Sequence, residues 1–397
     1  MMNRISSFHN YQTVQNDLRR QENKIHHNQA QLASGKQLQK PADDPLAVHY
    51  LQKVGQQSKQ LEQYNDAIVL TRNRLENQEV MIRETEQFSD KAKRLTMESI
   101  NGALSAQDRE AKAREIEELA RNFIALANSQ DESGNYVFAG TKPKFQPFLR
   151  DNNGDVRYVG DDYQRKMRIS NSMEIITSDP GSKLFMEIEN PFGDYQPDYS
   201  LTNKSELLLN RAENEDSRDD GTYKVTFVDM GQNNFAYQLE RNGKVVQVED
   251  YEPTTGIVYK DLTVTVKGQI SAGDSIELTP KKQFSVLDTF NQTIKWLDND
   301  VSDASATAKL HQFTEEFHQA FLHLTKARTD IGARLNTLDI QESQNEDYKL
   351  ALARSKSHFE DLDYSKAVIE FEENTRALQA SQQAFGKTKD LTLFNYL

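Results

Sequence analysis

A seven-residue repeat of apolar residues in the C-terminal third constrains the fold more than any other feature of the sequence. Only Asn345 interrupts the repeat, whose apolar members are Leu310, Phe317, Leu324, Ile331, Leu338, Leu352 and Phe359. A seven-residue period kept over this length is typical of a coiled-coil seam. We therefore expect one long helix, from near Ser302 to about residue 357, that packs along a partner helix.

A second repeat with the same period, in the N-terminal part, predicts that partner. Its members are Val54, Leu61, Ile68, Leu75 and Ile82. Asp44 is a good N-cap residue and Pro45 suits the first helical position, so the helix is expected to begin there. Asn101 and Gly102 mark its expected end.

A third helix is expected after Ser105, which forms a weak capping pair with Asp108. Its apolar residues recur at helical spacing: Ile116, Leu119, Phe123 and Ala127. The three helices can share one bundle, whose expected seam combines the residues of the two seven-residue repeats.

Each end of the chain carries its own apolar repeat of the same period. The N-terminal members are Tyr11, Leu18, Ile25 and Leu32, and the C-terminal members are Tyr364, Phe371, Leu378 and Phe385. We expect two helices that pair through these residues as an assembly seam. Gly35 suits a left-handed helix end and separates the first helix from the next.

The middle of the chain, from about residue 135 to 280, changes to a period of two and becomes rich in Gly and Asp. Residues 223–229 and 262–267 alternate apolar with polar side chains, which indicates strands. Asn153-Gly154 and Asn242-Gly243 are expected hairpin turns, because Asn and Gly both tolerate a positive φ. The acidic residues 213–220 are expected to form a solvated loop.

The predicted fold class is mainly α with a β-rich insertion: a long helical coiled-coil bundle formed by N- and C-terminal segments around a central β domain. The expected domains are an N-terminal inner-coil helix at 1–40, bundle segments at 41–145 and 284–360, a β-rich variable domain at 146–283, and a C-terminal inner-coil helix at 361–397.

Composition excludes several classes of function. The formal net charge of -13 disfavours a nucleic-acid partner, and no apolar run approaches the roughly 18 residues that membrane insertion needs. The absence of Cys excludes disulfides and thiol nucleophiles. We expect no cleaved signal peptide, since the first residues lack the charged-then-apolar pattern.

No catalytic, cofactor-binding or metal site is expected. His311 and His318 lie seven residues apart with Glu315 between them, without the His-Glu-x-x-His spacing of a zinc site. Asp151, Asn153 and Asp155 imitate the start of a calcium loop, but Val156 stands where that loop needs Gly. Phosphate-binding and nucleophile motifs are absent from the sequence, so we expect a protein that is not an enzyme.

Four passages give the chain a family resemblance. They are LASGK at residues 32–36, PADDPLA at 41–47, GNYVFAGT at 134–141 and GARLN at 332–336. Together with MNRIS at residues 2–6, they resemble the flagellin-like axial proteins of bacteria, in the form found in hook-associated proteins. In that family, residues 134–141 would form the strand after the third helix. The resemblance spans the chain outside residues of about 190 to 280.

The resemblance implies a structural subunit of the bacterial flagellum, at the junction between hook and filament, that assembles through its terminal helices. Implied partners are further copies in a ring, another hook-associated protein on the hook side, flagellin on the filament side, and a cytoplasmic export chaperone that binds the C-terminal region. The implied location is extracellular, reached without a cleaved signal peptide.

Two alternatives stay open. The first is flagellin itself, although its usual C-terminal end differs from LTLFNYL at residues 391–397 and its usual passage lacks the Asp-Pro pair at 44 and 45. The second, from a different class, is a scaffold that displays an adhesive or enzymatic outer domain in residues 190–280. That segment contains neither His nor Cys, which gives such a site little support.

Overall fold

The computed structural model describes residues 2–100, 104–151, 154–202, 205–216, 219–231, 234–298 and 303–390. The chain divides into two compact units. We call residues 1–66 with 340–397 the terminal unit, and residues 67–339 the central unit. The long helices α2 (Pro45–Ser99) and α6 (Ala304–Glu360) contribute to both. The predicted fold class, helical ends around a β-rich middle, is confirmed.

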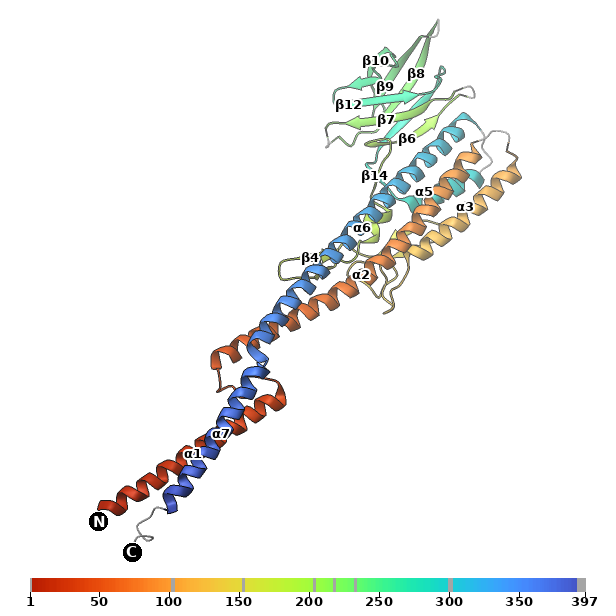
Figure 1. The fold of residues 1–397 in the computed structure, drawn as a ribbon. Coiled ribbons are helices and arrows are strands. Elements are labelled where there is room, and N and C mark those ends of the chain that lie inside the picture. The colour runs from red at the N-terminus through yellow and green to blue at the C-terminus, as the bar shows by residue number, and fades with distance from the viewer. Residues whose placement is uncertain are drawn as a thin grey trace. The chain divides into compact units, whose positions relative to one another are not determined.

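The terminal unit is helical. Helices α1 (Met2–Ser34) and α7 (Tyr364–Asp390) lie side by side (Figure 1), and the first part of α2 packs on the last part of α6. The predicted start of α2 is confirmed, because Asp44 Oδ1 accepts hydrogen bonds from the backbone N–H groups of Leu46 and Ala47, both at 3.0 Å. Helix α2 ends at Ser99, and its expected end at Asn101 and Gly102 lies outside the described residues.

The central unit combines a helical bundle with two sets of strands. The rest of α2 and α6 pack with α3 (Ala106–Ala127) and α5 (Val286–Asp298) around one core. Ser105 and Asp108 form a full capping box at the start of α3, stronger than the weak pairing expected. Phe123, Phe290 and Phe317 meet in this core, with ring centroids 5.6 and 4.8 Å apart along the series.

The residues expected as one β-rich domain, 146–283, contribute to two separate cores. The short helix α4 (Gly181–Phe185) and five of the short strands add their apolar side chains to the helical core. The strands concerned are β1 (Phe148–Arg150), β2 (Val156–Tyr158), β4 (Glu174–Ile176), β5 (Ile188–Glu189) and β14 (Gln283–Phe284). A further short strand, β3 (Lys166–Arg168), pairs with β4. Phe148 and Phe185 are fully buried, and their ring centroids lie 5.7 Å apart.

The remaining strands build a domain with its own core, which we call the β domain. A five-stranded sheet has the order β10-β9-β8-β13-β6, and a three-stranded sheet has the order β11-β12-β7 (Figure 1). The strands are β6 (Tyr195–Ser200), β7 (Leu208–Asn214), β8 (Tyr223–Gly231), β9 (Asn234–Arg241), β10 (Lys244–Asp250), β11 (Ile257–Tyr259), β12 (Leu262–Lys267) and β13 (Ser275–Pro280).

The turn predictions fare differently. Asn242 and Gly243 have φ of 51° and 75° and join β9 to β10, as expected for a two-residue hairpin turn. Strands β1 and β2 also pair as a hairpin, but their connection is longer than two residues, and Asn153 lies outside the described residues. Residues 134–141 form turns with one isolated bridge at Tyr136, so the strand implied by the family resemblance is wrong here.

The expectation of a solvated loop at residues 213–220 is also partly wrong. Strand β7 extends to Asn214, and Asp219 accepts hydrogen bonds from Tyr223, from Asn214 at 3.0 Å and from Arg241 at 2.5 Å. Burial would raise the pKa of Asp219, but these donors and the Gly221 N–H lower that pKa to about 2. Asp219 therefore ties the end of β7 to β8 and β9.

We predict that Asp219→Ala destabilises the β domain, because Tyr223 and Arg241 lose their acceptor. The expected loss is about 1 to 3 kcal/mol in the free energy of unfolding, measured by urea denaturation at neutral pH. Since the folded-state pKa lies below the usual value of about 3.9, this stabilisation is present above about pH 4 and is lost as the pH falls toward 2. If Asp219→Ala lowered the free energy of unfolding by the same amount at pH 2.5 as at pH 7, this account would be wrong.

Candidate assembly interface

The expected assembly seam lies along α1 and α7. Tyr11 and Phe385 are in ring contact, with centroids 5.2 Å apart, near the free ends of the two helices. Both terminal repeats contain half-buried members, namely Leu18, Ile25 and Leu32 on α1 and Phe371, Leu378 and Phe385 on α7. The first member of each repeat is more exposed, Tyr11 at 46% and Tyr364 at 54%. The pair alone therefore leaves much of its own seam in contact with water.

Polar side chains lie three residues after two of the apolar repeat members of α1: Gln21 follows Leu18, and Asn28 follows Ile25. The seam predicted from the sequence contained only the apolar members. Gln21 on α1 donates from Nε2 to both the backbone oxygen and Oδ1 of Asn374 on α7, each at 3.1 Å. Asn28 lies one heptad after Gln21 on α1, and its side chain is only 6% exposed. Its Nδ2 has no hydrogen-bond acceptor among the described residues. The seam thus carries a polar stretch beside its apolar series.

Backbone hydrogen bonds join the end of α1 to the residues just before α7. Gly35 has a φ of 69°, the left-handed conformation expected of a helix end, and its N–H donates to Gln31 O at 2.8 Å. Its carbonyl accepts from the Leu362 N–H at 3.0 Å. Lys36 pairs with Glu360 at 2.5 Å, and this hydrogen bond raises the pKa of Lys36. A Cβ added at Gly35 would lie 3.0 Å from Tyr364 Oη, so glycine also keeps the approach open.

The expected bundle seam falls into two parts. In the terminal unit Val54, Leu61 and Leu352 are buried together, and half-buried Phe359 contacts Tyr50 with ring centroids 4.7 Å apart. In the central unit the members are buried in the helical core: Ile68, Leu75, Ile82, Leu310, Phe317, Leu324, Ile331 and Leu338. The long helices hold these side chains on one face because the period of the repeat matches the helical turn.

The one polar member of the long repeat is accommodated by partners. Asn345 is 3% exposed, donates to Asn65 Oδ1 on α2 at 2.9 Å and accepts from Gln341 at 2.9 Å. A buried amide with its hydrogen bonds made can fix the register of two helices.

Sequence reasoning missed an ion pair within the GARLN passage. Arg334 binds Asp179 through two hydrogen bonds of 2.6 and 3.1 Å, and both side chains are largely buried. The pair ties α6 to the loop before α4. The only sequence signal for this ion pair is that Arg334 belongs to the GARLN passage. Its spacing does not distinguish it from the surface arginines of the same helix.

A second missed feature is apolar exposure on the terminal unit. On α7, Val368 is 44% and Ile369 58% exposed, close to exposed Tyr364. Leu46 at the start of α2 is 79% exposed, and Leu350 on α6 is 51% exposed. Val368 and Ile369 are adjacent in the sequence, whereas Leu46 and Leu350 lie on two other helices.

The candidate ligands for metals behave as ordinary side chains. Burial lowers the pKa of His311, and in the part of the chain that the structure describes there is no group of three or more His, Asp or Glu arranged to hold a metal ion. Asp155 accepts from Asn291 at 2.5 Å and from Lys295 at 3.4 Å, so it joins the β1–β2 loop to α5. Among the described residues, no helix combines the length and apolar character required to cross a membrane.

Comparison with known proteins agrees with this architecture. Residues 5–143 match the family model of the bacterial flagellin N-terminal helical region. Flagellar hook-associated protein 3 of Escherichia coli K12 is 21% identical over 366 residues, which cover 92% of this chain and 90% of that protein. Hook-associated protein 3 of Salmonella typhimurium is 26% identical over 158 residues, which cover 40% of this chain and 49% of that protein.

Solved structures show the same fold. The crystal structure of FlgL from Xanthomonas campestris is 26% identical with a TM-score of 0.60, and covers 71% of this chain and 93% of that one. The flagellar junction protein FlgL from Legionella pneumophila has a TM-score of 0.66 at 24% identity, with 78% and 99% covered.

The proteins that the chain resembles are structural flagellar proteins and not enzymes, which agrees with the lack of catalytic motifs in the sequence. The chain matches the flagellin N-terminal helical region at residues 5–143 and resembles flagellar hook-associated protein 3 over most of its length.

Proposed function

We propose that this protein is the subunit that joins the hook to the filament of the bacterial flagellum, and that it assembles through packing of α1 and α7. The observation that carries this proposal is the incomplete burial of the terminal seam. Leu18, Ile25, Phe371 and Leu378 stay half-exposed although α1 and α7 lie side by side. In a complete coiled coil such residues are buried, so neighbouring subunits are needed to cover them.

The exposed apolar residues of the terminal unit support the same conclusion. Covering the exposed part of a side chain such as Ile369 or Tyr364 contributes on the order of 1 kcal/mol by burial of apolar surface. Several such residues per subunit, repeated around a ring, stabilise an assembly that no single contact could hold.

The proposed partners follow from the relatives' names and from the family resemblance. Further copies form a ring, another hook-associated protein contacts it on the hook side, and flagellin contacts it on the filament side. A cytoplasmic export chaperone binds the C-terminal region before export. The protein then reaches the extracellular flagellum.

We propose a separate role in the assembly for each of the expected domains. Segments 1–40 and 361–397 form the inner coil, segments 41–145 and 284–360 form the bundle, and segment 146–283 carries the variable outer surface through its β domain. The separate core of the β domain supports this division, because that domain needs few residues of the terminal unit to fold.

A deletion strain tests the function directly. We predict hooks without filaments by electron microscopy, with flagellin lost to the medium, and rescue by the unaltered gene. The protein should be a minor component of sheared flagella. If it were instead the dominant band, the chain would be a filament subunit and the junction role would be wrong.

Seam variants test the mechanism in the same strain. Ile25→Asp and Leu378→Asp each place a charge in the coil, which costs several kcal/mol when the coil is buried. We predict that neither restores swimming. The matched controls Gln29→Asp and Gln379→Asp, at exposed positions of the same helices, should restore it. Intact filaments in cells that carry either seam variant would refute the seam assignment.

Amide hydrogen exchange tests whether the coil depends on assembly. Helices of this length with a half-exposed seam are marginal in water. We predict that amides of residues 11–32 and 364–385 exchange much faster in the monomer than those of residues 67–99 and 305–339, and slow down upon assembly. Strong protection of residues 11–32 in the monomer would show that α1 and α7 need no neighbours.

A further inference from the structure

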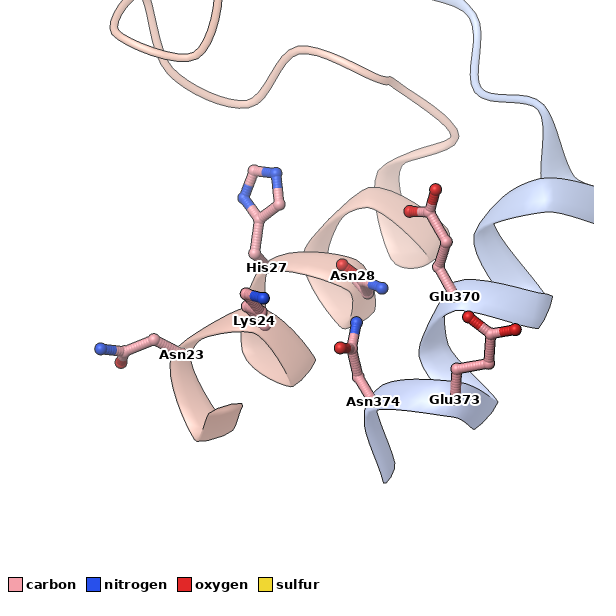
Figure 2. A pocket seen from close by; sticks show the side chains of 7 residues that line it. All are labelled: Asn23, Lys24, His27, Asn28, Glu370, Glu373 and Asn374. Atoms are coloured by element: carbon pink, nitrogen blue, oxygen red, sulfur yellow. The ribbon is translucent and has the colours of Figure 1, made fainter. Parts of the chain in front are cut away.

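A polar cavity of about 530 Å³ opens between α1 and α7 in the terminal unit (Figure 2). Six of the side chains that line it matter here: Lys24, His27 and Asn28 from α1, and Glu370, Glu373 and Asn374 from α7. Figure 2 shows the amides of Asn28 and Asn374 between the two helices, with His27, Glu370 and Glu373 directed to the same side of the pair. The cavity is large enough to receive several side chains from another molecule.

The buried amide of Asn28 needs a hydrogen-bond acceptor that the described chain does not provide. Its side chain is only 6% exposed, lines the cavity, and has an unpaired Nδ2. Asn374, on the opposite wall, is already engaged by Gln21. Native structures rarely leave a buried donor unpaired, so the acceptor comes from outside the chain: water in the free monomer, and a group of the partner in an assembly.

The walls of the cavity carry opposite charges. The α1 wall has Lys24 and His27, and the α7 wall has Glu370 and Glu373. Neither Lys24 nor Glu373 has an ion-pair partner among the described residues, and Glu370 is paired only with Lys366 of its own helix, at 3.9 Å. The cavity therefore has a lysine on its α1 wall and two carboxylates on its α7 wall.

We propose that this cavity is the docking site for a second copy of the chain, whose acidic α7 edge sits against the basic α1 edge. A carboxylate oxygen of the incoming Glu370 or Glu373 accepts the hydrogen bond from Asn28 Nδ2, and Lys24 neutralises the charge. This inference rests on the proposed assembly through α1 and α7, and adds which faces meet.

A second copy fits better than any other occupant because each copy supplies both halves of the contact. The contact uses Lys24 of one copy and Glu370 or Glu373 of the other, so both of its halves are present in every copy.

The natural absence of Cys makes a disulfide test clean. A deletion strain co-expresses two variants, Lys24→Cys and Glu373→Cys, each with a different epitope tag. Isolated flagella are oxidised, and the disulfide-linked pair that carries both tags is measured by immunoblotting. Because each chain has one Cys, such a pair forms only between copies. We expect this mixed pair to exceed at least fivefold the same product from the control variants Glu22→Cys and Arg376→Cys, which lie at exposed positions of the same helices.

A mixed pair no more abundant than that of the controls would overturn the proposal. Loss of swimming with Lys24→Cys or Glu373→Cys alone, while both controls swim, would support it. If swimming survives Ile25→Asp, the proposed assembly itself fails; if only the crosslink fails, assembly stands and these faces do not meet.

Variants of Asn28 separate docking from a purely internal role. In the Lys24→Cys and Glu373→Cys background, Asn28→Leu removes the donor and fills the seam with an apolar side chain, which should stabilise the α1–α7 pair. We expect a several-fold lower yield of the mixed pair together with slower amide exchange in α1 of the monomer. An unchanged yield with slower exchange would show that Asn28 serves only the pairing of α1 with α7.

Discussion

The pairing of the two chain ends is the constraint on which the rest of the terminal unit depends. Helices α1 and α7 come from opposite ends of the sequence, yet each provides the apolar surface that the other needs. Backbone hydrogen bonds at Gly35 and Leu362 hold the two helices at one end, where Lys36 and Glu360 add an ion pair. From that end the two helices lie side by side, and Tyr11 and Phe385 are still in ring contact near their other ends.

The two seams of the chain differ in how far their side chains are buried. Along α2 and α6, Ile68, Leu75 and Leu324 are fully buried within a bundle of four helices. Along α1 and α7 the corresponding residues stay half-exposed, and Gln21 and Asn374 replace apolar side chains. Polar residues in a seam lower the stability of a helix pair but increase the selectivity for one arrangement. The core of the bundle is thus fully buried within the chain, whereas the seam of the terminal pair stays partly exposed.

Period and capping chemistry made most of the helical architecture predictable from the sequence. Asp44, Ser105 and Gly35 act as expected because helix ends have unpaired backbone groups that such residues satisfy. The β region was less predictable. Apolar residues of the short strands between 148 and 189 belong to the helical core, since short strands carry too little periodicity to reveal what they pack against. Asp219 looked like one more surface carboxylate because its donors, Tyr223 and Arg241, approach through sheet pairing. Asn28 was missed for a similar reason: its burial depends on a helix more than 300 residues away.

The short strand pair β5–β14 lies where the chain passes from the helical core to the β domain and back. Ile188 lies opposite Phe284 and Glu189 opposite Gln283, so the polypeptide leaves the helical core and returns to it at one place. The chain between these strands also contacts α6, because Lys309 donates to Pro197 O at 3.1 Å and to Asp198 at 3.3 Å, and Ala308 lies in the core of the β domain. A change of the β domain that keeps these contacts can leave the helical core intact, whereas one that removes them exposes Ala308 on α6.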